Sequence, residues 1–200
     1  MPDSGLPQTD RPRMAELLDI AARLFNEKGY KATSLAEIGD ALGMNKASLY
    51  YYVKSKDDLL AHVIYRASQR LRVLAEGIAE NRDDPGSALS RLVRTHCNTI
   101  LDHPDEFGTV IFQRRHIAST VLPEIAERER VYFDAVKDLV ARGAEDGVFR
   151  RCDTGIAAQM LLDTMNGILR WYRPDGRLSR DTAIDEIVAF ATHALAGATT

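Results

Sequence analysis

The sequence predicts an all-α protein of about nine helices, in which a small N-terminal unit is joined by a long helix to a larger helical bundle. From Met14 onward the apolar residues recur at spacings of three and four, which is the period of one helical face. Glycine and proline separate these periodic segments. No run alternates apolar and polar residues between hairpin turns, and residues 148–150 form the only strand-like fragment.

Each expected helix is a periodic segment bounded by a capping residue or a break. The expected helices cover residues 14–28, 34–42, 45–53, 55–81, 87–102, 106–117, 123–145, 154–172 and 180–196. The chain therefore divides into a tail (1–10), a three-helix unit (11–54) and a bundle for ligand binding and dimerisation (55–200).

Composition narrows the class of protein. The chain has 200 residues, of which 45 % are hydrophobic and 28 % charged, so it can bury a core and is neither collagen-like nor wholly disordered. Residues 1–10 lack the apolar run of a signal peptide and are expected to be disordered. No apolar stretch reaches the roughly 20 residues that span a bilayer. We therefore expect a cytoplasmic protein with no membrane partner.

The N-terminal unit has the signals of a helix-turn-helix. Gly29 ends the first helix, and Ser34 with Glu37 forms a capping box for the second. Gly43 stands where a left-handed C-terminal residue is wanted, and Asn45 can cap the third helix. Two short helices joined by a tight turn can place the second one in the major groove of DNA.

The third helix carries side chains that suit DNA. It presents an amide, a lysine, a hydroxyl and tyrosines, with no acid. Asn45 and Lys46 can hydrogen-bond base edges, and Ala47 can touch a thymine methyl group. The side chains that can contact phosphate oxygens are those of Ser48, Tyr50, Tyr51 and Lys56. The backbone amides at the capped helix starts near Thr33, Ser34 and Ser55 can also bind phosphate.

The charge distribution agrees with this interpretation. The formal net charge of the chain is −3, which taken alone disfavours nucleic acid as a partner. Residues 11–56, however, carry eight Lys or Arg against five Asp or Glu, whereas residues 57–200 carry eighteen against twenty-two. Positive charge is concentrated in the N-terminal unit. The excess is small, so we expect affinity to depend on dimerisation and a paired half-site.

Capping and periodicity alone fit a purely structural three-helix unit equally well. The residues themselves resemble the TetR family of transcriptional repressors. The matching motifs are AARLF (21–25), GYKATSL (29–35), Ile38, GMNKASLYYYV (43–53) and KSKDDLL (54–60). Gly39 stands where this family more often has alanine, and we expect it to weaken its helix slightly.

The resemblance implies a homodimer whose helix-turn-helix units bind a palindromic operator. A small ligand in the C-terminal bundle would change the spacing of the two units and release the DNA. The resemblance also implies which side chains meet DNA, with Tyr50 and Lys56 at phosphates. The implied set is Asn45, Lys46, Ser48, Tyr50, Tyr51 and Lys56.

A second resemblance concerns the ligand. Residues 160–176, with the ending Trp171-Tyr172-Arg173-Pro174, are similar to TetR-family regulators of steroid or fatty-acid degradation, which sense acyl-CoA thioesters. Such a sensor needs an apolar tunnel and cations for the phosphates. The candidate cations are Arg114, Arg115, Arg170 and Arg173. The predicted ligand-binding residues are His96, Phe107, Ile111, Phe112, Arg115, His116, Leu161, Met165 and Trp171, with Leu162 as a further tunnel residue.

Two alternatives stay open for these residues. The apolar set also fits ordinary bundle core, and the arginines fit solvated positions. Trp171 and Tyr172 also fit a contact with a second subunit, because aromatic residues are enriched at interfaces. In that case the last two helices form a four-helix dimer interface. Its candidate residues are Leu161, Met165, Ile168, Ile184, Ile187, Val188 and Ala191.

Other functions lack a motif. His96 and Cys97 are adjacent and so lie on different helix faces, and no Cys-x-x-Cys or His-Glu-x-x-His appears, so we expect no metal. A helical enzyme would need a nucleophile elbow, a phosphate loop or a cofactor motif, and none is present. We expect no cofactor. A drug-sensing repressor of an efflux gene is the alternative for the ligand class.

Overall fold

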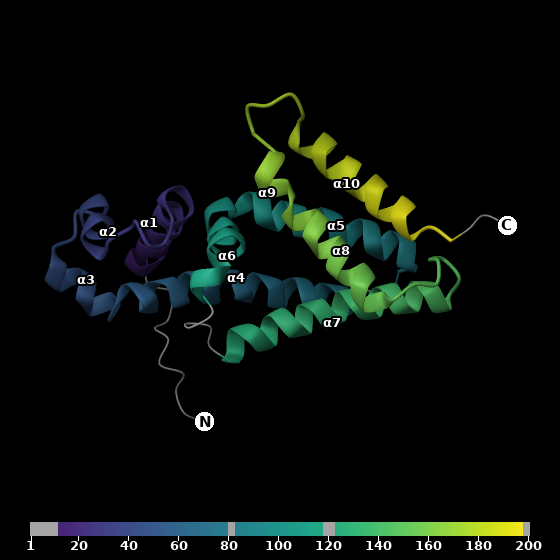
Figure 1. Ribbon diagram of the computed structural model, residues 1–200, viewed down its shortest axis with the longest axis horizontal. Coiled ribbons are helices and arrows are strands. Elements are labelled where there is room, and N and C mark those ends of the chain that lie inside the picture. The colour runs from purple at the N-terminus through teal and green to yellow at the C-terminus, as the bar shows by residue number, and fades with distance from the viewer. Residues whose placement is uncertain (1–11, 80–82, 118–122, 198–200) are drawn as a thin grey trace. The chain divides into compact units, whose positions relative to one another are not determined.

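The computed structural model describes residues 12–79, 83–117 and 123–197, with the side chains of 114–117 outside the description. All regular secondary structure in these residues is helical, which confirms the all-α prediction (Figure 1). The helices are α1 (Pro12–Lys28), α2 (Leu35–Ala41), α3 (Lys46–Tyr52), α4 (Lys56–Ala79), α5 (Pro85–Asp102), α6 (Pro104–Ile117), α7 (Pro123–Glu145), α8 (Thr154–Asn166), α9 (Ile168–Trp171) and α10 (Arg180–Leu195). The predicted tail, residues 1–10, lies outside the described residues.

The local signals at the start of the chain act as predicted. Gly29 and Gly43 have φ of +87° and +62°, a conformation that glycine adopts without strain, and they follow the ends of α1 and α2. The Ser34 hydroxyl accepts a hydrogen bond from the Glu37 amide at 3.1 Å. Asn45 caps α3 by accepting from the Ser48 amide at 2.8 Å. The helix-turn-helix is therefore specified by local sequence.

Glu37 uses its carboxylate differently from the predicted capping box. It pairs with Lys28 from the end of α1, and this hydrogen bond lowers the pKa of the Glu37 carboxyl. Gly39 also has a packing role, since a β-carbon there would lie 3.2 Å from the Met44 carbonyl oxygen. The glycine lets the turn between α2 and α3 close against the helix.

The described residues fall into two compact units. We call the first the head (described residues of 12–69 and 103–126) and the second the body (described residues of 70–102 and 127–197). The helices α4 and α7 contribute residues to both units. The head therefore includes α6 and part of α4 in addition to the predicted three-helix unit. The functional boundary after residue 54 stays a prediction.

The head is held together by an apolar core around α1 and by polar contacts between α1 and α6. Leu17, Leu18 and Phe25 are fully buried in this core. Asn26 donates to Asp105 of α6 at 3.0 Å. A β-carbon on Gly108 of α6 would overlap the Asn26 side chain, so the glycine permits the close approach of the two helices.

A buried ion pair adds α4 to this packing. The guanidinium of Arg66 lies 2.9 Å from the carboxylate of Glu106, a residue that is only 4 % exposed. The same guanidinium pairs with Asp19 at 2.6 Å. Arg66 thus neutralises a carboxylate whose burial would otherwise be costly, and it joins α1, α4 and α6.

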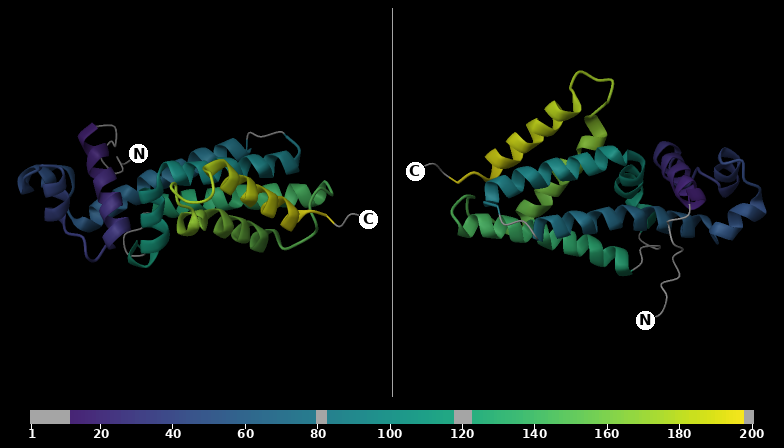
Figure 2. Two further views of the ribbon diagram at one scale, coloured as in Figure 1. Left: turned by 90° about the horizontal axis from the view of Figure 1, so that it is seen from above. Right: turned by 180° about the vertical axis from the view of Figure 1, so that it is seen from behind.

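The body is built on α5, α8 and α10, which pack side by side (Figure 2). Arg180 at the start of α10 donates to the side-chain and backbone oxygens of Asn98, each at 2.9 Å, and pairs with Asp102 at 2.8 Å. At the other end of α10, the amide of Arg150 donates to the Leu195 carbonyl at 2.8 Å. The strand-like fragment 148–150 is thereby reduced to one isolated bridge.

One predicted helix is divided in two. The segment 154–172 breaks at Gly167 into α8 and the short α9, which gives ten helices in the described residues instead of the expected nine. Beyond the break, the Arg170 amide donates to the Gly167 carbonyl three residues earlier, at 2.9 Å. This bond is typical of a tightened last helical turn, a feature that periodicity does not reveal.

Candidate nucleic-acid interface and ligand site

The helix α3 turns most of its side chains outward. Leu49 is 2 % exposed and anchors the helix to the head, whereas Tyr50 and Tyr51 are 47 % and 73 % exposed. Lys46 and Ala47 are also exposed. No acidic residue lies in α3. A polyanion that contacts α3 therefore meets no acidic side chain of this helix.

Asn45 and Lys46 are partly engaged at the start of this helix. The side-chain oxygen of Asn45 serves the cap, so the amide nitrogen is the group it can offer to a base. The Lys46 ammonium lies 5.9 Å from the centre of the Tyr50 ring, within the range of a cation–π contact. The Ser34 cap of α2 lies on the surface of the head.

The side chain of Thr33 lies inside the head, so the group near the start of α2 that this residue can offer to a phosphate is its backbone amide, as the sequence predicts. It is 1 % exposed, and its hydroxyl donates to the carbonyls of Leu24 and Gly29 at 3.2 and 3.0 Å. Its single hydroxyl proton therefore satisfies carbonyls at the end of α1. Any contribution of Thr33 to DNA binding falls to its backbone.

The ammonium group of Lys56, for which a phosphate contact was expected, has hydrogen-bond partners within the head. Its ammonium lies 2.9 Å from the carbonyls of Tyr30 and Thr33, and 3.5 Å from that of Lys31. It also lies 4.5 Å from the centre of the Tyr30 ring. The sequence contained one signal for this arrangement. A lysine in the first helical turn faces the positive end of the helix dipole, so it needs compensating acceptors.

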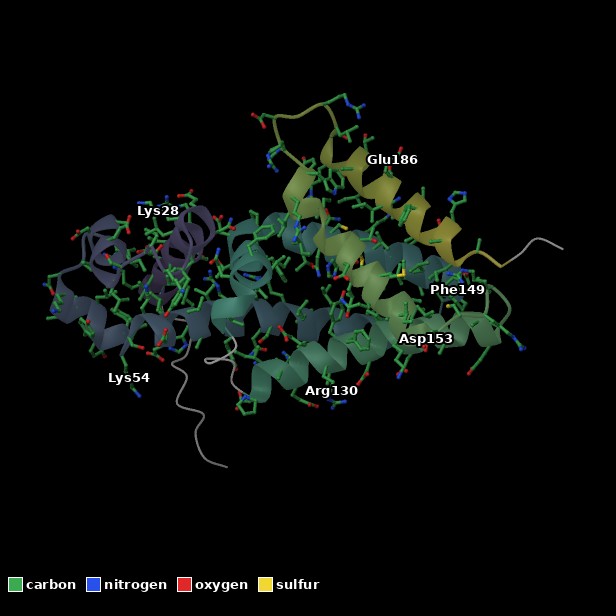
Figure 3. The ribbon with its side chains drawn as sticks, viewed as in Figure 1. Lys28, Lys54, Arg130, Phe149, Asp153 and Glu186 are labelled. Atoms are coloured by element: carbon green, nitrogen blue, oxygen red, sulfur yellow. The ribbon has the colours of Figure 1, made fainter. Side chains whose placement is uncertain are left out.

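Three further lysines of the head are exposed. Within residues 12–60, the ammonium groups of Lys31, Lys46 and Lys54 have no acidic side chain within 4 Å, and Figure 3 shows Lys54 pointing away from the ribbon. Arg13, in contrast, is paired with Glu16 at 2.6 Å. These three lysines are therefore candidate cations for a phosphate backbone.

His96 is the centre of a buried polar cluster in the body. It is 1 % exposed, with Nδ1 2.6 Å from the Tyr132 hydroxyl and Nε2 3.2 Å from the Asn166 side-chain oxygen. The amide oxygen only accepts, which assigns the ring proton to Nε2 and makes Nδ1 the acceptor for the Tyr132 hydroxyl. The two rings also stack, with centres 5.7 Å apart.

The cluster is neutral at physiological pH. Burial lowers the pKa of His96 to about 4, against a smaller opposing effect of the Asn166 hydrogen bond. Burial raises the pKa of the neighbouring Cys97 thiol to about 12, and it also raises the pKa of Tyr132. The groups therefore act as hydrogen-bonding partners that link α5, α7 and α8, without a net charge.

Sequence reasoning found His96 but missed its two partners. Tyr132 lies on the buried face of α7, in line with Ile125 one heptad earlier. A buried tyrosine hydroxyl needs a hydrogen-bond partner, and this need is the signal that could have identified Tyr132. Asn166 gave no comparable signal, because its role depends on where α8 ends.

The structure distributes the other predicted ligand residues over both units. Phe107, Ile111 and Phe112 lie in the head, and Phe112 is 37 % exposed. Leu161, Met165 and Trp171 lie in the body, where the first two are buried and Trp171 is 47 % exposed. The side chains of Arg114, Arg115 and His116 lie outside the described residues.

A hollow of about 390 Å³ lies in the body beside α4 and α7. Its lining residues are Ile78, Ala79, Arg130, Val131, Asp134, Ala135, Asp138, Leu139 and Arg142. None of the predicted ligand residues lines it. Two arginines face two aspartates, and Arg130 is already paired with Asp134 at 2.9 Å, so the lining shows no preference for an anion.

The apolar surface of the body differs from the predicted dimer contacts. Leu161, Met165, Ile168, Ile184, Ile187 and Ala191 are all buried within the body itself, and Val188 is half-buried. The exposed apolar side chains of α8 and α10 are instead Ile156, Met160 and Phe190, each more than 60 % exposed. The predicted dimer residues were wrong because α8 and α10 carry apolar residues on two faces. The predicted residues lie on the face that packs inside the body.

The described ranges contain neither a metal-binding cluster nor a membrane-crossing helix. No group of three or more His, Cys, Asp or Glu side chains there is arranged to hold a metal ion. No helix within 12–79, 83–117 or 123–197 has both the length and the apolar character that a membrane crossing requires.

Comparison with known families decides between a structural unit and a DNA-binding unit. A family model described as "Bacterial regulatory proteins, tetR family" matches residues 17–63. A second, "Tetracyclin repressor-like, C-terminal domain", matches residues 82–195, which is more than half of the chain. The chain belongs to the TetR family. It is therefore a helix-turn-helix DNA-binding transcriptional repressor, and the helical-enzyme alternative is excluded.

Named members of the TetR family match along most of the chain. The transcriptional repressor KstR2 of Rhodococcus jostii (strain RHA1) is 29 % identical over 188 residues, covering 92 % of this chain and 91 % of KstR2. The structure of the ketosteroid transcriptional regulator KstR2 of Mycobacterium tuberculosis has a TM-score of 0.84 at 25 % identity, covering 94 % of this chain and 97 % of the other.

A third relative was solved with its partners. The structure of AibR in complex with isovaleryl coenzyme A and operator DNA has a TM-score of 0.76 at 25 % identity. The match covers 89 % of this chain and 97 % of the AibR chain. The chain is thus similar, over nearly its whole length, to KstR2 and to AibR.

Proposed function

We propose that this TetR-family protein is a cytoplasmic homodimer that binds a palindromic operator through α3 and releases it when an acyl-CoA thioester binds. DNA binding is the common activity of the family. The observation that supports α3 as the reading helix is its outward surface, which carries lysine, tyrosine and alanine with no acid. Asn45, Lys46 and Ala47 read bases in this proposal, and Ser34, Ser48, Tyr50 and Tyr51 contact phosphates.

The exposed apolar side chains of α8 and α10 support the dimer. Ile156, Met160 and Phe190 belong to the body and are more than 60 % exposed, which is unusual for side chains of this size in a soluble monomer. A second copy of the same surface would cover them symmetrically. A dimer places two copies of α3 on one duplex, and this matches the small positive charge of residues 11–56 in a single chain.

The ligand class is supported by the chemistry around α9 and by two relatives. Trp171 is 47 % exposed, and the exposed side chain of Arg173 follows it. An exposed indole and an exposed arginine two residues apart suit the adenine and phosphates of a coenzyme A group. The AibR structure contains isovaleryl coenzyme A, and KstR2 is described as a ketosteroid regulator. The predicted roles of Arg115 and His116 are part of this proposal.

Release of operator DNA tests the ligand class. The operator is selected by the protein from a random-sequence duplex library, and its release is followed by fluorescence anisotropy. The probes are isovaleryl-CoA, palmitoyl-CoA, free coenzyme A, palmitate and the cationic dye rhodamine 6G. We expect release by at least one thioester at concentrations where coenzyme A and palmitate have no effect. Release by the dye alone would favour the drug-sensing alternative.

A pair of arginine variants sharpens this test. Arg173→Met removes a cation of the proposed coenzyme A site, and Arg151→Met removes an exposed cation from the loop before α8. We expect the first to raise the thioester concentration needed for release by about tenfold, because a charged hydrogen bond to phosphate is lost. The second should leave that concentration unchanged. Equal effects of the two variants would count against a coenzyme A site at α9.

A further inference from the structure

We propose that Lys56 is a positioning residue, which holds the loop before α2 in place and makes no phosphate contact. The proposal rests on operator binding by α3 as described above. It departs from the family resemblance, which puts this lysine at phosphate. The loop in question, residues 29–33, joins α1 to α2 and so determines where the DNA-reading pair of helices begins.

The ammonium group of Lys56 is fully used within the head. It has three N–H donors, and three carbonyl oxygens surround it, those of Tyr30 and Thr33 at 2.9 Å and that of Lys31 at 3.5 Å. The Tyr30 ring lies on another side, with its centre 4.5 Å away. To reach a phosphate, Lys56 would have to leave all of these partners.

Tyr30 is held at more than one point by the start of α4. Its carbonyl accepts from Lys56, its ring lies against the ammonium, and its hydroxyl donates to the carboxylate of Asp57. The Thr33 hydroxyl donates to the carbonyl of Leu24 in α1 at 3.2 Å and to the carbonyl of Gly29 at 3.0 Å. The loop is therefore fixed to α4 through Lys56 and Asp57, and to the end of α1 through Thr33.

The contact with the Thr33 carbonyl links this arrangement to DNA reading. Thr33 directly precedes Ser34, the N-cap of α2, so fixing its carbonyl fixes the first turn of that helix. The turn of α2 into α3 is rigid in its own right, with the Met44 amide donating to the Gly39 carbonyl at 2.8 Å. A displacement of the loop is thus passed to α3 as a displacement of the whole pair.

Lys54 provides a matched control two residues away. Its side chain is exposed, its ammonium group has no acidic side chain within 4 Å, and it follows Val53, the C-cap of α3. Its backbone amide, which a substitution leaves in place, donates to Asp58 at 2.8 Å. A phosphate contact by Lys54 adds equally to binding of every duplex and to its salt dependence. Loss of a positioning residue acts differently. It lowers affinity for the selected operator, leaves affinity for unrelated DNA nearly intact, and leaves the salt slope unchanged.

The experiment compares Lys56→Met with Lys54→Met in the full-length protein. Affinities for the library-selected operator and for a scrambled duplex of equal length are measured between 50 and 300 mM KCl. We expect K56M to weaken operator binding by roughly tenfold or more at an unchanged salt slope, so that the ratio of specific to non-specific affinity falls. We expect K54M to weaken both duplexes alike and to reduce the slope by about one per head.

Two further measurements keep the outcome decisive if K56M is unstable. In Lys56→Arg the charge is retained but the planar guanidinium cannot direct three donors at the three carbonyls, so we expect operator affinity to fall as in K56M. A phosphate-contacting lysine would tolerate this change. Hydrogen exchange of the free protein should be faster at the amides of residues 30–34 in K56M, and unchanged there in K54M.

The proposal is overturned if K56M lowers the salt slope and weakens both duplexes alike, if K56R binds operator as well as the unmodified protein, or if exchange in the loop is unaffected. Failure of the proposed function looks different. In that case the unmodified protein itself selects no duplex from the library. The exchange measurement, which uses no DNA, still tests the hold of Lys56 on the loop.

Discussion

The head and the body expose different kinds of side chain. In the head, α3 exposes Lys46 and Tyr51 and no acid, whereas in the body α8 and α10 expose Met160 and Phe190. The buried polar groups of the two units also differ. The head buries an ion pair between Arg66 and Glu106, whereas the body buries the uncharged cluster around His96. The exposed groups of the head fit a polyanion, and for the exposed apolar groups of the body we propose a second copy of the chain as the partner.

The largest expected effect is on the body surface. Phe190→Glu places a charge on the proposed dimer face, and we expect monomers and a loss of operator affinity of about a hundredfold, since paired half-sites are then bound singly. Light scattering after size exclusion gives the mass. Val73→Glu is the control, because Val73 is also an exposed apolar residue of the body, at 59 %. If F190E remains a dimer, the exposed apolar face of the body is not the dimer interface.

Next in size is a packing effect inside the body. A β-carbon on Gly143 would overlap the ring of Phe149, which is 5 % exposed, so we expect Gly143→Ala to destabilise the body by about 2–3 kcal/mol. Gly77→Ala is the opposite case, because a β-carbon there meets nothing within 4 Å, and we expect it to stabilise α4 by about 0.5–1 kcal/mol. Urea unfolding followed by Trp171 fluorescence measures both changes.

The neutral cluster of the body predicts a pH dependence. Burial lowers the pKa of His96 from about 6.5 in the unfolded chain to about 4 in the folded one, so the unfolded state takes up a proton first as the pH falls. The contribution of His96 to the free energy of unfolding is therefore fully present above pH 6.5 and is lost as the pH falls toward 4. Between pH 7.5 and pH 5 we expect a loss of about 2 kcal/mol from this group. Equal declines in His96→Gln and the unmodified protein would contradict it.

The smallest effect concerns the cations of the head. Lys31→Met removes one of the three exposed lysines whose ammonium groups have no acidic side chain within 4 Å. We expect binding to weaken a few-fold for every duplex, with the slope of log affinity against log salt reduced by about one per head. Arg13→Met is the comparison, because Arg13 is already paired with Glu16 and donates to the Leu42 carbonyl. An unchanged slope in K31M would remove Lys31 from the phosphate-binding set.

The helix-turn-helix could be predicted because its determinants are local. The caps Ser34 and Asn45 and the positive-φ Gly43 each act within three or four residues, and such short spacings can be read directly along a chain. The side-chain roles that were missed depend on contacts between distant segments. Lys56 binds carbonyls more than twenty residues earlier, and His96 depends on Asn166, seventy residues away. No local pattern encodes either pairing.

The dimer face shows a second limit of periodicity. The helix α8 has buried residues such as Leu161 and exposed apolar residues such as Met160, so apolar side chains cover much of its circumference. A helical period then cannot say which face is turned to the core of its own chain. The structure answers that question for the inner face only, and the outer face is assigned from its exposure.

The hold of Lys56 on the loop has an evolutionary consequence. All of its hydrogen-bond acceptors are main-chain carbonyls, which every residue type supplies. The side chains of Lys31 and Ala32 are therefore free to drift during divergence without weakening the contact, whereas the lysine itself has no equivalent replacement. Such a residue is constrained without a covarying partner, so methods that search for paired substitutions would pass over it.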